Sequence, residues 1–309
     1  MARFLLSRAV QAVVSILGVS TIVFVVMHLS GDPTLLLVPE GASREDVALL
    51  RRQLGFDRPL AVQYADYLAS LARLDLGTSL VQRVSVASIL ASRLPYTLLL
   101  AAGALTVALG IGLPVGVIAG VWRGTLVEKL LMPVVLVGQS MPTFWSGILL
   151  ILLCAVTLDV LPASGADSWS SLVMPSIALG ALSMATFARV TRTGVVEELG
   201  KDYVRAGRAK GVATASIVLR HVLRNASIPV ITIAALEVAN LLAGAVIVET
   251  VFAWPGLGQL AVQSIAGRDF LIVQALVLLA SFTCVALNLL ADLLYSAVDP
   301  RITRLAGAR

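Results

Sequence analysis

The chain is a succession of long apolar segments joined by charged connections. Hydrophobic residues make up 58% of it and charged residues 13%, well below the ~25% charged residues that are usual in soluble domains. A lipid core about 30 Å thick is crossed by roughly 20 apolar residues of helix, and backbone polar groups in lipid must be satisfied inside the helix. The sequence therefore predicts an all-α, polytopic membrane protein with six transmembrane helices, near residues 9–29, 96–120, 130–155, 172–190, 228–250 and 271–296.

The distribution of lysine and arginine predicts the orientation of these helices. The two short connections at residues 156–171 and 251–270 contain only Arg268 as a basic residue. The termini and the alternate connections hold Arg3, Arg8, Arg123, Lys129, a basic run within residues 197–224, Arg301, Arg304 and Arg309. Because cytoplasmic loops are enriched in Lys and Arg, we expect both termini in the cytoplasm. The first segment is too long for a secretory signal and is expected to stay as an uncleaved helix.

Residues 30–95 form a connection long enough to be translocated regardless of its arginines. It contains two amphipathic patterns, one after Ser43 and Asp46, which have capping-box-like spacing, and one after Pro59. They predict helices that lie on the outer membrane interface or pack on the spans, with contact to an extracytoplasmic partner as the alternative. We expect residues 1–95 to form one domain and residues 96–309 to form a core of five transmembrane helices.

Polar residues inside the predicted spans are expensive in lipid and usually face the bundle interior or a water path. Glu237 and Asn240 share a face of the fifth segment, and Asn288 and Asp292 share a face of the sixth. We interpret these four residues as candidates for a translocation path. A hydrogen-bond network that holds the bundle together is the alternative.

Residue patterns typical of catalysis are missing from the sequence. It contains no phosphate-binding Gly-x-x-x-x-Gly-Lys-Ser/Thr motif and no His-Glu-x-x-His zinc motif, and its two histidines, His28 and His221, are predicted on opposite sides of the membrane. Cys154 and Cys284 lie in apolar segments and are not expected to form a disulfide. We predict a non-catalytic subunit that binds no metal or cofactor itself, and the net charge of +5 does not indicate nucleic-acid binding because topology accounts for it.

The basic connection between the fourth and fifth segments has the features of a docking element. Asp202 can cap a short helix, Ala206 and Ala209 give that helix a thin side, and Gly211 can turn the chain out of it. A helix with small side chains fits a groove on another protein, so this connection predicts a docking surface.

The sequence resembles the inner-membrane permease subunits of ATP-binding-cassette importers of the dipeptide/oligopeptide/nickel group, in particular the first, B-type, dipeptide permease subunit. The resemblance is carried by Leu-Gly-Phe-Asp-Arg-Pro-Leu and Asp-Leu-Gly-Thr-Ser in the first connection, and by Met-Pro-Thr-Phe-Trp, Glu-Thr-Val-Phe-Ala-Trp-Pro-Gly-Leu-Gly, Arg-Asp-Phe and Asp-Pro-Arg further on. These motifs stand at residues 54–60, 75–79, 141–145, 249–258, 268–270 and 299–301.

The resemblance implies a type I importer permease fold and a coupling loop at about residues 191–227. Its ATPase-coupling helix would consist of Asp202, Tyr203, Val204, Arg205, Ala206, Gly207, Arg208, Ala209, Lys210 and Gly211. Gly207 departs from the family's usual Glu-Ala-Ala pattern, in which alanine stands at this place. Since Gly in a helix costs about 1 kcal/mol relative to Ala, we expect a softer helix or a closer approach of its backbone to the ATPase.

The resemblance also implies partners. They are a second, similar but distinct permease subunit forming a heterodimer, two cytoplasmic ATPase subunits that bind ATP and Mg²⁺, an extracytoplasmic solute-binding protein, and the lipid of the bacterial cytoplasmic membrane. The loop after residue 251 is our candidate contact for the binding protein, through Trp254, Pro255, Gly256 and Gly258. A re-entrant cap on the bundle is an equally good interpretation of these four residues.

For the ligand, the resemblance favours a dipeptide or short oligopeptide. Other members of the group carry nickel chelates, glutathione or heme-like ligands, and these remain alternatives. A stand-alone channel or secondary carrier is a competing function, although matching inverted halves, which many carriers show, are not evident in the sequence. A membrane receptor or assembly scaffold is a third.

Overall fold

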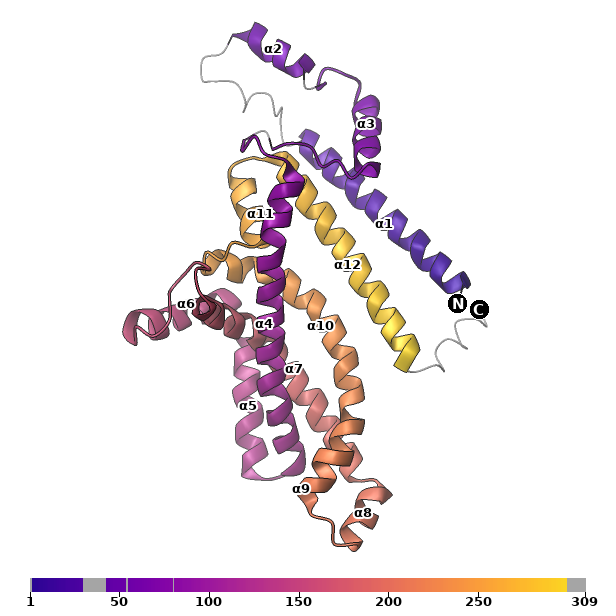
Figure 1. Cartoon of the computed structure of the whole chain (residues 1–309), viewed down its shortest axis with the longest axis vertical. Coiled ribbons are helices and arrows are strands. Elements are labelled where there is room, and N and C mark those ends of the chain that lie inside the picture. Colours follow the sequence, from indigo (N-terminus) through magenta and orange to yellow (C-terminus); the bar gives the residue numbers. More distant parts are fainter. Residues whose placement is uncertain (1, 30–42, 54, 80, 299–309) are drawn as a thin grey trace. The chain divides into compact units, whose positions relative to one another are not determined.

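The computed structural model describes residues 2–29, 43–53, 55–79 and 81–298, and this part of the chain is helical without a strand. The predicted all-α fold is therefore confirmed (Figure 1). The α-helices are α1 (Ala2–Leu29), α2 (Arg44–Gln53), α3 (Leu60–Ala72), α4 (Val86–Val121), α5 (Leu126–Ser140), α6 (Thr143–Leu150), α7 (Val173–Leu199), α8 (Asp202–Ala209), α9 (Thr214–Ile217), α10 (Leu223–Val251), α11 (Leu257–Ala266) and α12 (Phe270–Val298). Ile151–Thr157 and Val218–Val222 are π-helical, and Trp169–Leu172 is a 3₁₀ turn.

The chain divides into two compact units. The first consists of residues 1–95 and 260–285, and the second of residues 96–259 and 286–309. Helices α4 and α12 each run from one unit into the other. The predicted domain boundary at residue 95 separates parts of the chain with different expected roles, whereas these units are defined by their internal contacts. The boundary therefore remains a prediction.

In the first unit, α3 packs on α1 through aromatic residues. Phe24 of α1 stacks on Tyr67 with ring centroids 5.8 Å apart, and the hydroxyls of Thr21 and Tyr64 share a hydrogen bond of 2.6 Å. The two amphipathic helices predicted in the long connection are confirmed as α2 and α3. For α3, the observed contact is the packing on an apolar helix that the sequence offered as one interpretation.

In the second unit, α7 packs against α5, α6 and α10. Its core includes Leu100 of α4, Leu179 of α7 and Leu241 of α10, which are almost completely buried. Small residues allow the helices to approach closely: a methyl group added at Gly116 of α4 would lie 2.5 Å from the carbonyl oxygen of Ala188 in α7. The bundle therefore depends on backbone proximity, as is common in membrane helices.

Four helical stretches of the described part are long and apolar enough to cross a membrane, at residues 86–121, 169–199, 214–251 and 270–287. A fifth is formed if α5 and the helix 143–157 count as one broken span. In α1, the apolar stretch found is the shorter Val13–Val26. Six spans and two cytoplasmic termini thus remain predictions, whereas a polytopic membrane protein is supported.

The third predicted span is not one straight helix. Its two halves meet at 104°, and the break falls at Met141 and Pro142, whose ψ angles of 135° and 133° are extended. A proline disfavours helical geometry in the residue before it and cannot donate a backbone hydrogen bond. The motif Met-Pro-Thr-Phe-Trp therefore marks a bend in the chain.

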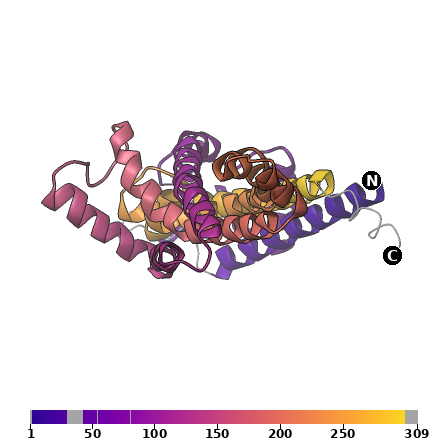
Figure 2. The same cartoon turned by 90° about the horizontal axis from the view of Figure 1, so that it is seen from below.

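Helices α8 and α9 lie together at one end of the second unit, remote from α6 (Figure 1). When the molecule is seen from below, this end faces the viewer (Figure 2). The connection between α7 and α10 is thus a compact helical element at the tip of the bundle. That position suits an element that docks onto another protein.

Candidate functional site

Helix α8 is the predicted coupling helix, and it exposes most of one side. Asp202, Arg205, Ala206, Arg208, Ala209 and the following Lys210 and Gly211 are exposed, whereas Tyr203 and Gly207 are partly buried and Val204 is fully buried. Asp202 and Arg205 form an exposed ion pair of 3.1 Å. The exposed surface of α8 therefore combines small side chains with positive charge, as predicted.

The start of α8 differs from the prediction by one residue. Lys201 occupies the N-cap position with extended backbone angles, and Asp202 is the first residue of the helix. No side chain caps this end. The carboxylate of Asp202 still lies in the first turn, where the helix dipole favours a negative charge.

Glu198, at the end of α7, fastens α8 to the bundle. Its carboxylate accepts hydrogen bonds from Lys201 Nζ at 2.5 Å, from Tyr203 Oη at 2.7 Å and from Asn225 Nδ2 of α10 at 3.2 Å. The hydrogen bond to Glu198 raises the pKa of Lys201, and burial together with that carboxylate raises the pKa of Tyr203. Both donors therefore keep their protons at neutral pH, and one carboxylate joins α7, α8 and α10.

Apolar packing reinforces this attachment. Val204 lies in a cluster with Val195 of α7, Ile217 of α9 and Val222. A methyl group added at Gly207 would lie 3.2 Å from Cδ1 of Ile217. The glycine that departs from the family pattern thus makes room for the chain's own α9, so a contact within the chain accounts for its small size.

Gly211 ends α8 in the way the sequence predicts. Its φ angle is +78°, which glycine adopts at little cost. Its N–H donates to the carbonyl of Arg208 at 2.9 Å, and the N–H of Val212 donates to the carbonyl of Gly207 at 3.1 Å. This is the Schellman pattern of a helix C-terminus, and it turns the chain towards α9.

The candidates for the translocation path have different surroundings. Glu237 of α10 is partly buried and accepts a hydrogen bond of 2.5 Å from Ser183 of α7, while Asn240 is exposed. The side chains of Asn288 and Asp292 lie outside the described residues. The bond from Ser183 fits the alternative of a structural network for Glu237, and a pathway role for the four residues stays a prediction.

A second polar centre surrounds Glu249, at the other end of α10. This residue is fully buried. Its Oε1 accepts a hydrogen bond of 2.7 Å from Thr97 of α4, and its Oε2 accepts the backbone N–H groups of Gly258 and Gln259 at 2.6 and 3.0 Å. Because those N–H groups belong to the first turn of α11, Glu249 caps that helix and neutralises its positive dipole end.

The residues that we predicted to contact a binding protein lie around this centre. Trp254, Gly256 and Gly258 are buried, and Pro255 is partly buried. Trp254 Nε1 donates to the carbonyl of Tyr96 at 2.9 Å, and a methyl group at Gly256 would collide with the Glu249 carboxylate. This burial fits the alternative interpretation, a cap packed on the bundle, and a binding-protein contact stays a prediction.

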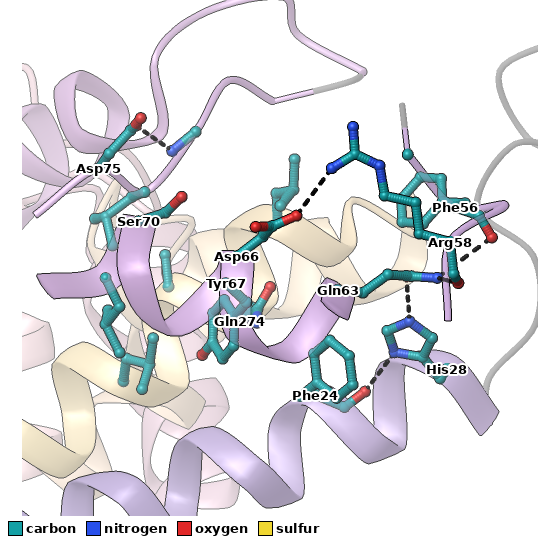
Figure 3. Close-up of a pocket in the computed structure, with 17 residues that line it drawn as sticks. Phe24, His28, Phe56, Arg58, Gln63, Asp66, Tyr67, Ser70, Asp75 and Gln274 are labelled. Atoms are coloured by element: carbon teal, nitrogen blue, oxygen red, sulfur yellow. Dashed lines mark hydrogen bonds and ion pairs between the residues drawn. The ribbon is translucent and has the colours of Figure 1, made fainter. Parts of the chain in front are cut away.

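The first unit contains a pocket of about 360 Å³ between α1, α3 and the start of α12 (Figure 3). His28 of α1 lies against Gln63 of α3 at 2.9 Å, and Gln63 donates to the carbonyl of Arg58 at 2.8 Å. At the rim Arg58 pairs with Asp66 at 3.1 Å, and both side chains are mostly exposed. Burial raises the pKa of Tyr67. These contacts join α3, in the long connection after α1, to α1 itself.

The chain thus combines a polytopic helical bundle with a short exposed helix, α8, at one end, and family comparison gives its class. Residues 112–304 match the family described as binding-protein-dependent transport system inner membrane component, and residues 1–101 match its N-terminal domain. The chain belongs to this family. It is a permease subunit of an ATP-binding-cassette importer and a multi-pass protein of the bacterial inner membrane.

Individual relatives extend over nearly the whole chain. It is 42% identical to the glutathione transport system permease protein GsiC of Salmonella typhimurium over 303 residues, covering 98% of this chain and 99% of the relative. It is 41% identical to the protein of the same description from Escherichia coli, with the same coverage.

Solved structures agree on the fold. The chain is similar to an inward-facing structure of the MetNI methionine ABC transporter, with a TM-score of 0.58 and 21% identity over 68% of this chain and 96% of that one. It is also similar to an amino acid ABC transporter with histidines, with a TM-score of 0.52 and 19% identity over 67% and 92%.

Two carboxylates that hold helices together, Glu198 and Glu249, were not predicted from the sequence. In the sequence, Glu198 is one residue of the basic connection and Glu249 is the first residue of the motif Glu-Thr-Val-Phe-Ala-Trp-Pro-Gly-Leu-Gly, and no hydrogen bonds were predicted for either. The signal for Glu249 was available, because an acid at the end of an apolar segment, five residues before Trp254 of Trp-Pro-Gly, needs buried donors. No comparable signal marks Glu198, since its partners Tyr203 and Asn225 lie on two other helices.

Proposed function

We propose that this permease imports short peptides, with glutathione as the leading candidate, and that α8 is the element through which ATPase subunits drive it. Glutathione, a modified tripeptide, is one of the alternatives to a dipeptide or short oligopeptide that the resemblance left open. The relatives that share 41–42% of their residues with this chain are described as glutathione permeases.

The observation that carries the proposal is the way α8 is held. It exposes Ala206 and Ala209 outward, and the carboxylate of Glu198 ties it to α7 and α10 on its inner side. Force applied to α8 therefore reaches two long helices of the bundle directly. A loop without such anchoring would yield before it moved the helices.

In the proposed complex, the chain pairs with a second, distinct permease, two ATPase subunits bind the cytoplasmic side, and a binding protein delivers the ligand. ATP binding shifts the permease between inward- and outward-facing states. It does so only to the extent that the ATPases bind α8 more tightly in one state, since equal affinity shifts nothing. A stand-alone channel or carrier would need neither the ATPases nor an anchored α8.

The proposal is tested with the complete importer and the variant Ala206→Trp. Because Ala206 is exposed, the indole leaves the packing inside the chain intact and blocks insertion of α8 into a groove. We expect the permease to reach the membrane in normal amount, while ATP-dependent uptake of radiolabelled glutathione falls at least tenfold. The control is Ala87→Trp, at an exposed alanine of α4 in the first unit.

Normal uptake by Ala206→Trp would contradict the coupling role. Uptake by purified permease without nucleotide would establish the stand-alone carrier instead. The substrate is tested separately, by competition between glutathione, a dipeptide and a nickel chelate in the wild-type importer. A ligand other than a short peptide that outcompetes glutathione would overturn the substrate part alone.

A further inference from the structure

We propose that the groove between α4, α7 and α10 next to α8 is a binding site for an anionic phospholipid, which places one acyl chain in the groove and its phosphate on Arg224. The site lies wholly in the second unit. It is separate from the exposed side of α8 and from the cap around Glu249.

The groove has the size and lining of a site for an alkyl chain. Its volume is about 620 Å³, within the ~300–1,000 Å³ of ordinary small-molecule sites. Its walls are almost entirely apolar and include Leu113 and Val117 of α4, Leu219, and Leu223 and Val230 of α10. Such a lining is unsuited to a charged peptide, since burying a charge without a partner is costly.

A buried threonine forms part of the groove wall. Thr191 of α7 lines the groove and is only 2% exposed. Its Oγ1 is enclosed by the chain itself, so the wall at this position offers no hydroxyl to a molecule in the groove. The groove therefore suits the hydrocarbon part of a lipid.

Charge at the rim favours an anionic headgroup. Arg224 lines the groove and is exposed, and Arg220 is exposed one turn before it. Neither takes part in an ion pair within the described part of the chain. Basic residues at the end of an apolar segment attract anionic lipid headgroups, so a phosphate satisfies both arginines in the place where the apolar groove ends.

The site adjoins the anchor of α8. Asn225, which follows Arg224, donates to the Glu198 carboxylate that also holds Lys201 and Tyr203. A lipid on Arg224 therefore stiffens the start of α10 where α8 is fastened. This predicts that anionic lipid supports coupling between ATP hydrolysis and transport.

The test uses the complete importer purified from vesicles of phosphatidylcholine with one quarter phosphatidylglycerol. Native mass spectrometry measures the phosphatidylglycerol retained per permease copy. We expect wild type to retain it in preference to phosphatidylcholine, and Arg224→Gln to retain it about fivefold less, which corresponds to one arginine at a lipid surface. Ser227→Phe fills the groove and abolishes the preference. Ser227 is suitable because its side chain bonds only the carbonyl of Arg224 in its own helix.

The matched control is Arg123→Gln, which removes an exposed arginine that does not line the groove and leaves retention unchanged. Thr191→Val, of nearly the same shape, also leaves retention unchanged, because the hydroxyl it removes is enclosed by the chain. Equal retention in wild type and Ser227→Phe, or a cross-link from Ser227→Cys to a helix of the second permease in the intact importer, would overturn the proposal. Both results are independent of which ligand the importer carries.

Discussion

Glu249 offers the sharpest test of how the end of the bundle opposite α8 is built. Replacing it with alanine removes a carboxylate that is fully buried and that accepts three hydrogen bonds, from Thr97, Gly258 and Gln259. Thr97 and Gly258 are buried, and Gln259 is partly buried. The Thr97 hydroxyl also accepts the N–H of Leu257 at 2.8 Å, so the whole first turn of α11 depends on this one side chain.

The size of the effect follows from the count of donors. Each buried donor left without a partner costs about 1–3 kcal/mol, so Glu249→Ala loses roughly 2–6 kcal/mol from the donors of Thr97 and Gly258, before any cavity cost. That is comparable with the ~5–15 kcal/mol that stabilises a typical domain. Glu249→Gln keeps the side-chain shape and one acceptor oxygen, but its hydrogen bonds no longer involve a negative charge. We expect this loss to lower the stability by about 2 kcal/mol. Alanine should therefore prevent assembly, and glutamine should only weaken it.

The assay is thermal unfolding of the purified importer, with the amount of assembled complex as a first readout. We expect no assembled complex with Glu249→Ala, and for Glu249→Gln a melting temperature lower by roughly 4–8 °C, at ~2–4 °C per kcal/mol. The control is Thr250→Val at the neighbouring exposed position, whose hydroxyl bonds only within α10. An assembled Glu249→Ala complex with the same melting temperature as the wild-type complex would refute the argument that Glu249 stabilises α11 by capping it.

Three further variants test other contacts. Gly116→Ala places a methyl group 2.5 Å from the carbonyl oxygen of Ala188, and this overpacking should lower the stability of the complex by about 1–3 kcal/mol in the same melting assay. The control is Gly110→Ala, whose methyl group meets nothing within 4 Å, so its melting temperature should be unchanged or higher. Glu198→Gln should loosen α8, which limited trypsin digestion detects as faster cleavage in residues 201–210, while the exposed Glu197→Gln should digest like wild type. Gly211→Val places a β-branched residue at the positive φ of the Schellman turn, which strains the backbone by about 1–2 kcal/mol. This variant should hydrolyse ATP without matching uptake. The same ratio of uptake to ATP hydrolysis as in wild type would show that the turn is dispensable.

The sequence predicts the fold well where one physical constraint dominates. Lipid requires long apolar helices, so α4, α7, α10 and α12 could be placed from hydropathy. The turn at Gly211 could be placed because an isolated glycine after a short amphipathic helix has few other uses. The amphipathic stripe containing Tyr64 and Tyr67 likewise predicts the side of α3 that packs on α1.

The rest depends on contacts between residues far apart in the sequence. The extended backbone at Met141 and Pro142 turns what reads as one apolar segment into two helices, and whether a membrane proline kinks or breaks a helix is decided by its neighbours. Glu249 has its partners 152 residues before and 9–10 residues after it. No local pattern encodes that arrangement, so the sequence left the loop around Trp254 open between a binding-protein contact and a cap on the bundle, and its burial fits the cap.

The central claim is that α8 receives force from an ATPase, and cross-linking tests it most directly. A cysteine is placed at the exposed Ala206 of the complete importer, with Cys154 and Cys284 replaced by alanine, and a short bifunctional thiol reagent is added with and without ATP. Our account predicts a cross-link from residue 206 to the ATPase subunit whose yield changes with ATP. A cysteine at residue 206 that never cross-links to the ATPase, yet reacts in intact cells with a membrane-impermeant maleimide, would contradict it.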